Sequence, residues 1–402
     1  MRVLIGGLFQ FVGMNGGVER VLVNFANEMY KRGHNVSLLY CTEVKGNAPY
    51  VLNPEVHLIN LIRWVPCGQF ESKQKNLLFK IRRELLRPFS KNAVKNENTR
   101  FILNKLGNAA EQVLQEEKPD VFVSIGYTTT AAFVEVAERQ GIPIITMTHI
   151  DAGSAVQWMS EIERKAVDRS DALQVLMPHD IDLFQRVLSK VSMKWIPNIV
   201  PQFEINNREK EKVIINVARL AKSPKRQHLL INSFSKIAEN FPEWRVEIWG
   251  NEDGAVDGQY TRELKTLINS CHLNERIKLC GRTDDVLSVY QRASIFAFPS
   301  AYEGFGLAMA EAMSAGLPVV AYRSCPAVNE LVRDGETGLL VDDGVDALAE
   351  GLKKLMEDQE LRERMGRAAH ESMKEFAPEK IWDQWEDLMQ DVIAKHKAKM
   401  ER

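Results

Sequence analysis

The sequence predicts an α/β protein built from two Rossmann-like domains that face a cleft. Short apolar runs alternate with helical patterns in both halves of the chain, which is typical of successive βαβ units and a parallel sheet. A polar, charged stretch without periodicity, residues 199–212, separates the two series and is predicted to be a linker. The length of 402 residues suits two domains of about 200 residues each.

The first series predicts six strands, at residues 3–8, 36–40, 121–125, 144–147, 172–175 and 193–196. An amphipathic helix follows the first of them, because apolar residues recur there at helical spacing: Val18, Val21, Leu22, Phe25, Ala26 and Met29. Arg32 and Gly33 are expected to end this helix. The first domain is placed at residues 1–198.

The second series predicts six more strands, at residues 213–217, 245–249, 277–279, 295–298, 318–321 and 338–341. A helical pattern covers 227–237, and another covers 381–399 near the end of the chain. We therefore expect a second domain at residues 213–378 and a terminal helical segment at 379–402.

Bulk properties exclude several classes of protein. The formal net charge of −2 argues against general nucleic-acid binding, which favours a strongly basic domain. Five scattered cysteines without paired metal spacing are typical of reduced thiols. No apolar run reaches the roughly 18–20 residues that span a bilayer, and the first residues lack a secretion pattern. The expectation is a soluble, cytoplasmic protein.

The most specific motif follows the predicted strand at 295–298. Glu303 stands just before a turn made of Gly304, Phe305 and Gly306, and Glu311 comes eight residues after Glu303 in a run of helix formers. Ligands of open α/β sheets bind at the carboxyl ends of strands, where a helix N-terminus offers N–H groups to phosphate. Carboxylates beside such a phosphate site suit the hydroxyl groups of a sugar nucleotide.

Two basic residues follow the first strand of the second domain. Arg219 can grip phosphate oxygens with a bidentate fork, and Lys225 can add a point charge, which together suit a diphosphate. Lys222 is the alternative to Lys225, which is preferred because it precedes the helical pattern at 227–237. Lys222 and Arg226 are interpreted as surface-loop residues.

In the first domain, Gly16 and Gly17 lie between the first strand and its helix. Glycines there allow the backbone to approach a ligand closely, and the alternative is a tight strand-to-helix turn. His149 follows the strand at 144–147, where it can bond a sugar, cap the next helix or satisfy a loop carbonyl. Asp151 is predicted to be a helix cap.

Arg282 and Thr283 follow the strand at 277–279. Taken alone, this segment predicts a turn and a helix start, with Thr283 or Asp284 as the N-cap.

The spacing of Glu303 and Glu311 resembles the signature of retaining glycosyltransferases of the GT-B fold, in the large family numbered four. The resemblance covers nearly all of the second domain and is sparse in the first. It implies that Glu303 binds the donor sugar, that Glu311 binds the ribose and that Arg219 and Lys225 bind the diphosphate. The catalytic residues that it implies are His149, Glu303, Arg219 and Lys225. Further donor contacts that it implies come from Gly16, Gly17, Arg282, Thr283, Gly304, Phe305, Gly306 and Leu307. It also implies that the last helix crosses back to the first domain.

The implied activity is transfer of a hexose or N-acetylhexosamine from a nucleoside diphosphate sugar, with UDP the commoner donor, to an acceptor hydroxyl. Cell-surface polysaccharide or lipopolysaccharide assembly is the expected setting. No cofactor or metal is expected, since there is no aspartate-rich motif and the basic residues replace a divalent ion. Two alternatives remain: a nucleotide-sugar epimerase, and a non-catalytic accessory subunit of a glycosyltransferase complex.

Residues 73–105 carry ten lysines and arginines against two acids. Within them Leu78, Ile81, Leu85 and Phe89 recur at helical spacing, and Pro88 is expected to end or kink the helix. A basic amphipathic helix can lie on an anionic membrane surface. That interpretation predicts a peripheral position at the inner face of the membrane and a lipid-linked acceptor. The alternative is a solvated helix that packs its apolar face on the first domain.

Overall fold

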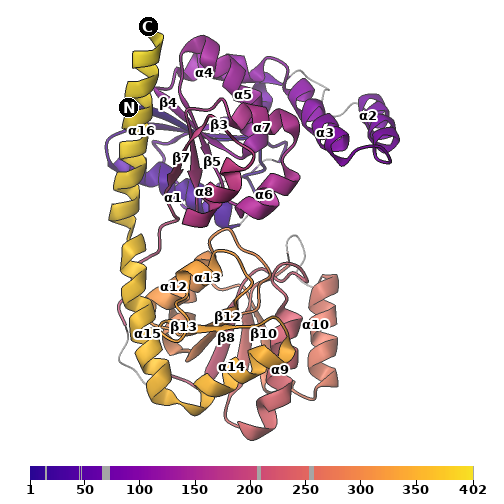
Figure 1. Ribbon diagram of the computed structural model, residues 1–402, viewed down its shortest axis with the longest axis vertical. Coiled ribbons are helices and arrows are strands. Elements are labelled where there is room, and N and C mark those ends of the chain that lie inside the picture. The colour runs from indigo at the N-terminus through magenta and orange to yellow at the C-terminus, as the bar shows by residue number, and fades with distance from the viewer. Residues whose placement is uncertain are drawn as a thin grey trace. The chain divides into compact units, whose positions relative to one another are not determined.

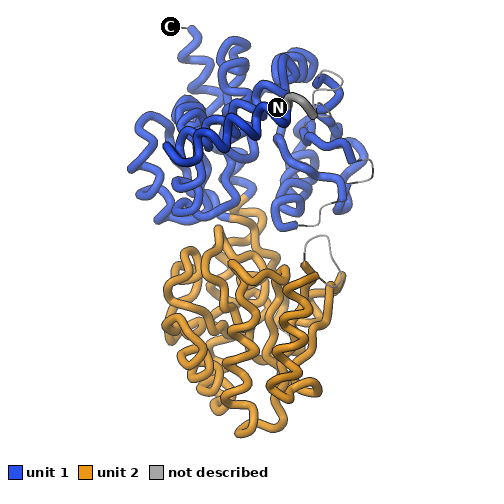
Figure 2. Tube along the Cα trace, turned by 90° about the vertical axis from the view of Figure 1, so that its right-hand side faces the viewer, with its two compact units in different colours: residues 1–197, 382–402 blue, residues 198–381 orange. Residues whose placement is uncertain are grey.

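The computed structural model describes residues 1–13, 16–44, 46, 48–65, 73–205, 210–252 and 258–401. The chain divides into two compact units (Figure 2). One contains Met1–Pro197 together with Trp382–Arg402, and the other contains Asn198–Ile381.

The first unit is built on a seven-stranded parallel sheet with the order β3-β2-β1-β4-β5-β6-β7. Its strands are β1 (Arg2–Gly6), β2 (Asn35–Tyr40), β3 (His57–Asn60), β4 (Val121–Ile125), β5 (Ile144–Met147), β6 (Ala172–Val175) and β7 (Ser192–Trp195). Six of them lie within two residues of the predicted strands. The prediction missed β3, because this edge strand buries Ile59 and leaves His57 and Leu58 exposed, so it carries no apolar run.

Helices flank this sheet (Figure 1). They are α1 (Gly17–Lys31), η1 (Leu61–Trp64), α2 (Lys73–Leu86), α3 (Lys91–Leu106), α4 (Ala109–Glu117), α5 (Tyr127–Gln140), α6 (Ala152–Trp158), α7 (Glu161–Val167) and α8 (Pro178–Gln185). The predicted amphipathic helix is α1, which buries Leu22, Phe25 and Met29. As predicted, Pro88 lies just beyond the end of a helix, since α2 ends at Leu86.

The second unit contains a six-stranded parallel sheet with the order β10-β9-β8-β11-β12-β13. Its strands are β8 (Val213–Val217), β9 (Arg245–Trp249), β10 (Ile277–Gly281), β11 (Ile295–Phe298), β12 (Val319–Tyr322) and β13 (Gly338–Val341). All six coincide with predicted strands to within two residues, because buried parallel strands are near-continuous apolar runs.

The helices of the second unit complete the βα alternation. They are α9 (Gln227–Ile237), η2 (Ala238–Asn240), α10 (Gln259–Ser270), α11 (Val286–Arg292), α12 (Leu307–Ser314), α13 (Val328–Leu331), α14 (Val345–Glu357), α15 (Gln359–Met373), η3 (Lys374–Phe376) and the start of α16 (Pro378–Met400). Among the described residues, no helix is both long and apolar enough to cross a membrane.

Helix α16 begins in the second unit and continues into the first, to which its residues belong from Trp382 onward. The rings of Trp382 and Trp385 pack edge-to-face on Phe25 of α1, with centroid distances of 5.8 and 5.2 Å. Arg32, which caps α1, donates to Asp383 at 2.7 Å. Burial of these two large aromatic rings anchors this end of the chain to α1.

The strand order places a topological switch in each sheet. Consecutive strands run outward in opposite directions from the β1–β4 pair in the first unit and from the β8–β11 pair in the second. The loops that leave the carboxyl ends of such a pair diverge, which opens the crevice where open α/β sheets bind ligands. The most specific sequence motifs follow β8 and β11.

Candidate active site

In the second unit, the loops after β8 and β11 meet at the switch point. The Lys225 Nζ atom lies 2.6 Å from Glu303 Oε1, and the two side chains are 18% and 11% exposed. The backbones of these loops also join, since the Ala301 N–H donates to the Pro224 carbonyl at 2.9 Å. A close, largely buried pair of this kind is held more firmly than a surface ion pair.

Arg226 fastens the same two loops, which corrects its interpretation as a surface residue. Its guanidinium donates to the carbonyls of Pro299 at 2.8 Å and Ser300 at 3.0 Å, and it pairs with Asp343 at 3.1 Å. The group also lies over the Tyr322 ring, 4.8 Å from the centroid. Because these carbonyls lead directly into the Glu303 loop, Arg226 acts as a positioning residue for that carboxylate.

Arg219 leaves the end of β8 and is exposed. Its carbonyl accepts a 2.9 Å hydrogen bond from the side chain of Gln227, which is fully buried and therefore fixes the start of this loop. Lys222 is exposed and pairs with Glu263 of α10 at 2.9 Å. The structure thus brings Lys225 rather than Lys222 to the motif carboxylate.

Glu311 is buried on α12 and takes part in a contact that the sequence did not indicate. The Tyr290 hydroxyl of α11 donates to Glu311 Oε2 at 3.2 Å, and the Tyr290 side chain is fully buried. A buried carboxylate oxygen needs such a donor, because a polar atom without a partner is costly in the interior. Tyr290 therefore positions Glu311, and nothing in the apolar pattern around it distinguishes it from an ordinary core aromatic residue.

Gly306 is the N-cap of α12 and lies in the left-handed region, with φ of +82°. Any residue with a Cβ would be strained there, so the glycine sets the direction in which the helix N-terminus at Leu307 points. Phe305 is buried and its ring packs on Phe376 at a centroid distance of 5.6 Å. Its side chain anchors the loop to the core, so a donor contact from this residue can come only from its backbone.

The segment after β10 differs from the prediction in its cap. The N-cap of α11 is Asp285, whose side chain accepts from the Ser288 N–H at 3.1 Å. Thr283 instead forms the preceding turn, where its hydroxyl accepts from the Asp285 N–H at 3.0 Å. The prediction of Thr283 or Asp284 as the cap was therefore wrong. The Thr283 hydroxyl accepts from the backbone N–H of Asp285 and forms a turn, so the helix begins only after Asp285. Arg282 is exposed.

In the first unit, Gly16 is the N-cap of α1, and both Gly16 and Gly17 are exposed. The Tyr50 hydroxyl donates to the Gly16 carbonyl at 3.2 Å. A Cβ atom at Gly16 would lie 2.6 Å from Glu19 Oε2, so a larger residue would displace this carboxylate. The glycine pair follows β1, one strand of the switch pair in this sheet.

His149 follows β5 after one intervening residue and is partly exposed, with its Nε2 atom buried. Burial lowers the pKa of its imidazole to about 4, so the ring is neutral at pH 7. The Nε2 atom has no hydrogen-bond partner among the described residues. Asp151, as predicted, caps α6 by accepting from the Ser154 N–H at 2.8 Å. The Nε2 atom of the neutral ring is therefore a nitrogen that a ligand could bond.

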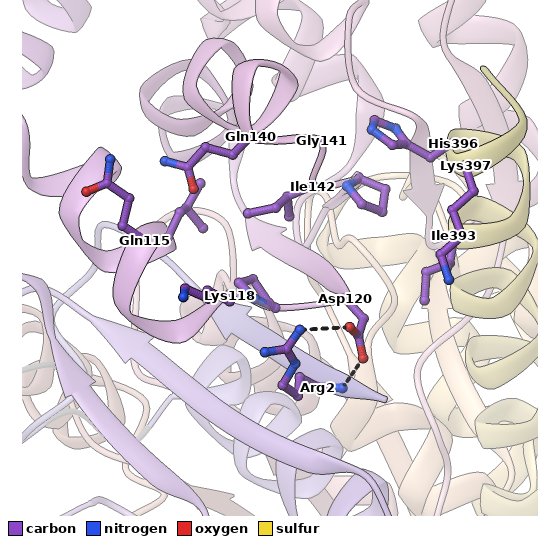
Figure 3. A pocket seen from close by; sticks show the side chains of 13 residues that line it. Arg2, Gln115, Lys118, Asp120, Gln140, Gly141, Ile142, Ile393, His396 and Lys397 are labelled. Atoms are coloured by element: carbon purple, nitrogen blue, oxygen red, sulfur yellow. Dashed lines mark hydrogen bonds and ion pairs between the residues drawn. The ribbon is translucent and has the colours of Figure 1, made fainter. Parts of the chain in front are cut away.

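A cavity of about 740 Å³ also lies in the first unit, bordered by α4, α5 and α16 (Figure 3). It contains the pair between Arg2 and Asp120, whose side chains are 3.3 Å apart. These residues precede or begin their strands, so the cavity is at the amino ends of β1 and β4. Ligands of open α/β sheets bind at the opposite, carboxyl ends, and we do not assign the reaction to this cavity. Among the described residues, no cluster of three or more His, Cys, Asp or Glu side chains could hold a metal ion.

Comparison with known families matches both halves of the chain. Residues 201–372 match the model of glycosyl transferases group 1, and residues 15–201 match the model of glycosyltransferase family 4. The two matches together run from before α1 to the end of α15.

Individual proteins agree with these matches. An N-acetyl-D-galactosaminyltransferase of Campylobacter jejuni, named for a GalNAc-containing undecaprenol diphosphate acceptor, is 25% identical over 94% of this chain and 96% of its own length. An exopolysaccharide phosphotransferase of Streptomyces coelicolor is 33% identical over 56% of this chain, which spans 24% of that protein. The solved sucrose-phosphate synthase of Thermosynechococcus elongatus shares the fold, with a TM-score of 0.75 and 18% identity over 98% of this chain and 99% of that one.

The fold and the family matches define the class: the chain is a glycosyltransferase of the GT-B fold. More particularly, it belongs to the group 1 and family 4 glycosyltransferases and is a hexosyltransferase-type enzyme of glycan assembly. Neither the epimerase nor the accessory-subunit alternative is favoured by these matches.

Proposed function

We propose that the enzyme transfers a hexose or N-acetylhexosamine from a UDP-sugar to an acceptor hydroxyl with retention of the anomeric configuration. The observation that carries the proposal is the 2.6 Å pair of Lys225 and Glu303 at the switch point of the second sheet. The pair brings a cationic and an anionic side chain together in one place. When a donor binds, Lys225 would contact the diphosphate and Glu303 would accept hydrogen bonds from the sugar hydroxyl groups.

The proposed reaction begins with cleavage of the bond between the anomeric carbon and the diphosphate oxygen. Negative charge then grows on the leaving phosphate, where Arg219, Lys225 and the N-terminus of α12 would stabilise it by fixed electrostatics. The acceptor oxygen bonds to the anomeric carbon on the same face. Its proton passes to the departing phosphate, so no carboxylate nucleophile is needed.

Three further groups would orient the donor. Glu311, held by Tyr290, would accept hydrogen bonds from the ribose hydroxyls, and the backbone at Arg282 and Thr283 would line the base. His149 is proposed to bond the donor sugar through its neutral ring, which fits its enclosed and unpartnered Nε2 atom.

The acceptor is proposed to be lipid-linked, with the enzyme at the inner face of the membrane in polysaccharide or lipopolysaccharide assembly. Support comes from the Campylobacter relative, which is named for a glycan on undecaprenol diphosphate.

The test is transfer of labelled sugar into extracted membrane lipids, with UDP-, GDP- and ADP-sugars offered in parallel. We expect label to enter the lipid fraction from one UDP-sugar and to be released by an exoglycosidase specific for the α-linkage of the donor. Incorporation from a GDP- or ADP-sugar instead would overturn the choice of base. Release only by a β-specific exoglycosidase would overturn retention.

A further inference from the structure

Helix α2 is the outer member of a helical hairpin in the first unit. It packs on α3, which in turn packs on α7 (Figure 1). The seam between the two helices is a stacked pair of rings, Phe79 and Phe101, with centroids 4.0 Å apart. Arg83 lies over the Phe79 ring and Lys105 over the Phe101 ring, at 5.7 and 4.5 Å. One face of α2 is therefore used in holding the hairpin together.

The opposite face of α2 is apolar and exposed. Six of the eleven large hydrophobic side chains that are exposed in the described part of the chain lie in this hairpin. Five belong to α2 and the turn after it, and they are between 50% and 86% exposed: Leu77, Leu78, Ile81, Leu85 and Phe89. We call these five the α2 apolar row.

The four helical members of the row form one continuous stripe. At about 100° per residue they fall within an arc of about 100°, on the other side of the helix from Phe79 and Arg83. This contradicts the alternative in which the helix packs its apolar face on the first domain. Monomeric proteins rarely leave contiguous apolar surface of this kind without a use for it.

The charges around the row determine what can cover it. Residues 73–105 carry ten basic residues against two acids, and both acids are already paired. Glu84 bonds Arg83 and Arg87, each at 2.8 Å, and Glu97 pairs with Arg82 at 3.3 Å. The hairpin therefore presents an excess of positive charge beside an apolar stripe.

An anionic bilayer satisfies both features. A second copy of the chain would bring this basic hairpin against another basic hairpin, which like-charge repulsion opposes. A nucleic-acid backbone would meet the charges, but it offers nothing to the aliphatic side chains of the row. At a lipid surface the row enters the boundary between headgroups and acyl chains, while basic side chains reach the phosphates.

We propose that α2 docks the enzyme on an anionic lipid surface, with the α2 apolar row inserted and Lys80, Arg82 and Arg87 among the headgroups. This docking rests on the proposed function, since a lipid-linked acceptor would be met at such a surface. It also has its own readout, because lipid binding is measured without any substrate.

The experiment is co-sedimentation of the full chain with vesicles of pure phosphatidylcholine and with vesicles that also contain phosphatidylglycerol. We expect binding only to the anionic vesicles, with loss of binding at high salt. The double variant Leu78→Ser/Leu85→Ser should bind at least tenfold more weakly, since it removes two apolar side chains of the row from the lipid boundary. The matched control is Val51→Ser, which changes an apolar side chain that is 90% exposed outside the hairpin.

Three outcomes would overturn the proposal. The first is equal binding by the double variant and the wild type, and the second is no preference for anionic vesicles. The third is a wild-type dimer in light scattering that the double variant converts to a monomer, because a second copy then covers the row. Calorimetric binding of nucleotide to the same variants separates the two proposals. If the double variant loses vesicle binding but still binds nucleotide, the result bears on the lipid surface alone. If the wild type fails to bind nucleotide, the result bears on the proposed function alone.

Discussion

Replacement of Lys225 by methionine is expected to lower the turnover number for sugar transfer by roughly 10²–10³-fold, while the protein remains folded. Methionine keeps the apolar stem, which extends toward the Phe298 ring with Nζ 5.6 Å from the centroid, and it removes the charge. The lost charge is the one that we assign to the leaving diphosphate. Turnover is measured with the labelled donor of the lipid-transfer assay.

The matched control is Lys222→Met in the same loop. Lys222 is exposed and pairs with Glu263 on the surface, so this variant should keep wild-type turnover. Wild-type turnover in Lys225→Met, or an equal loss in both variants, would contradict the assignment of Lys225.

Changing Glu303 to glutamine is expected to reduce kcat/KM for the donor by roughly 10²–10³-fold. The amide keeps the size of the carboxylate and one acceptor oxygen, but it loses the charge that strengthens hydrogen bonds from sugar hydroxyls. It also leaves the Lys225 ammonium without its partner in a largely buried position. We therefore expect a loss of stability of about 1–3 kcal/mol in thermal unfolding.

A double variant separates the catalytic from the structural consequence. Lys225→Met/Glu303→Gln removes both charges, so no uncompensated charge remains in the loop pair. Its stability should return toward that of the wild type, whereas its turnover should stay as low as that of either single variant. Recovery of turnover together with stability would show that the pair only holds the loops.

Most of the fold could be predicted because buried parallel strands leave a clear signal. The strands β4 and β8, for instance, are runs of β-branched and large apolar residues with both faces covered. The edge strand β3 has only Ile59 buried and therefore lacked that signal. Amphipathic helices such as α1 were equally clear, since their apolar spacing is a local property of the chain.

The candidate site could be predicted where one loop holds its polar residues in a short motif. It could not be predicted where the interacting residues are far apart along the chain. Glu303 and the glycine turn stand together in a short motif, and Lys225 follows a recognisable strand. Arg226 is different: its partners Pro299 and Asp343 are 73 and 117 residues away along the chain. A basic residue in a polar loop is indistinguishable from a surface residue until the sheet brings those loops together.

The exposure of the α2 apolar row was beyond sequence reasoning for a similar reason. Helical spacing shows that Leu78, Ile81 and Leu85 share a face, but the same spacing describes a face that packs on the protein. Only the position of the Phe79–Phe101 stack decides which side of α2 is turned inward.

We propose that the switch point of the second sheet binds a nucleoside diphosphate sugar. The most direct measurement is isothermal calorimetry of the wild type and Arg219→Ala with UDP, GDP, ADP and their common sugars, without added metal. We expect the wild type to bind the uridine series and Arg219→Ala to bind it at least tenfold more weakly, through loss of a charged phosphate contact worth about 1.5–3 kcal/mol. Folded wild-type protein that binds no nucleotide in the panel, or a variant that binds UDP as tightly as the wild type, would contradict it.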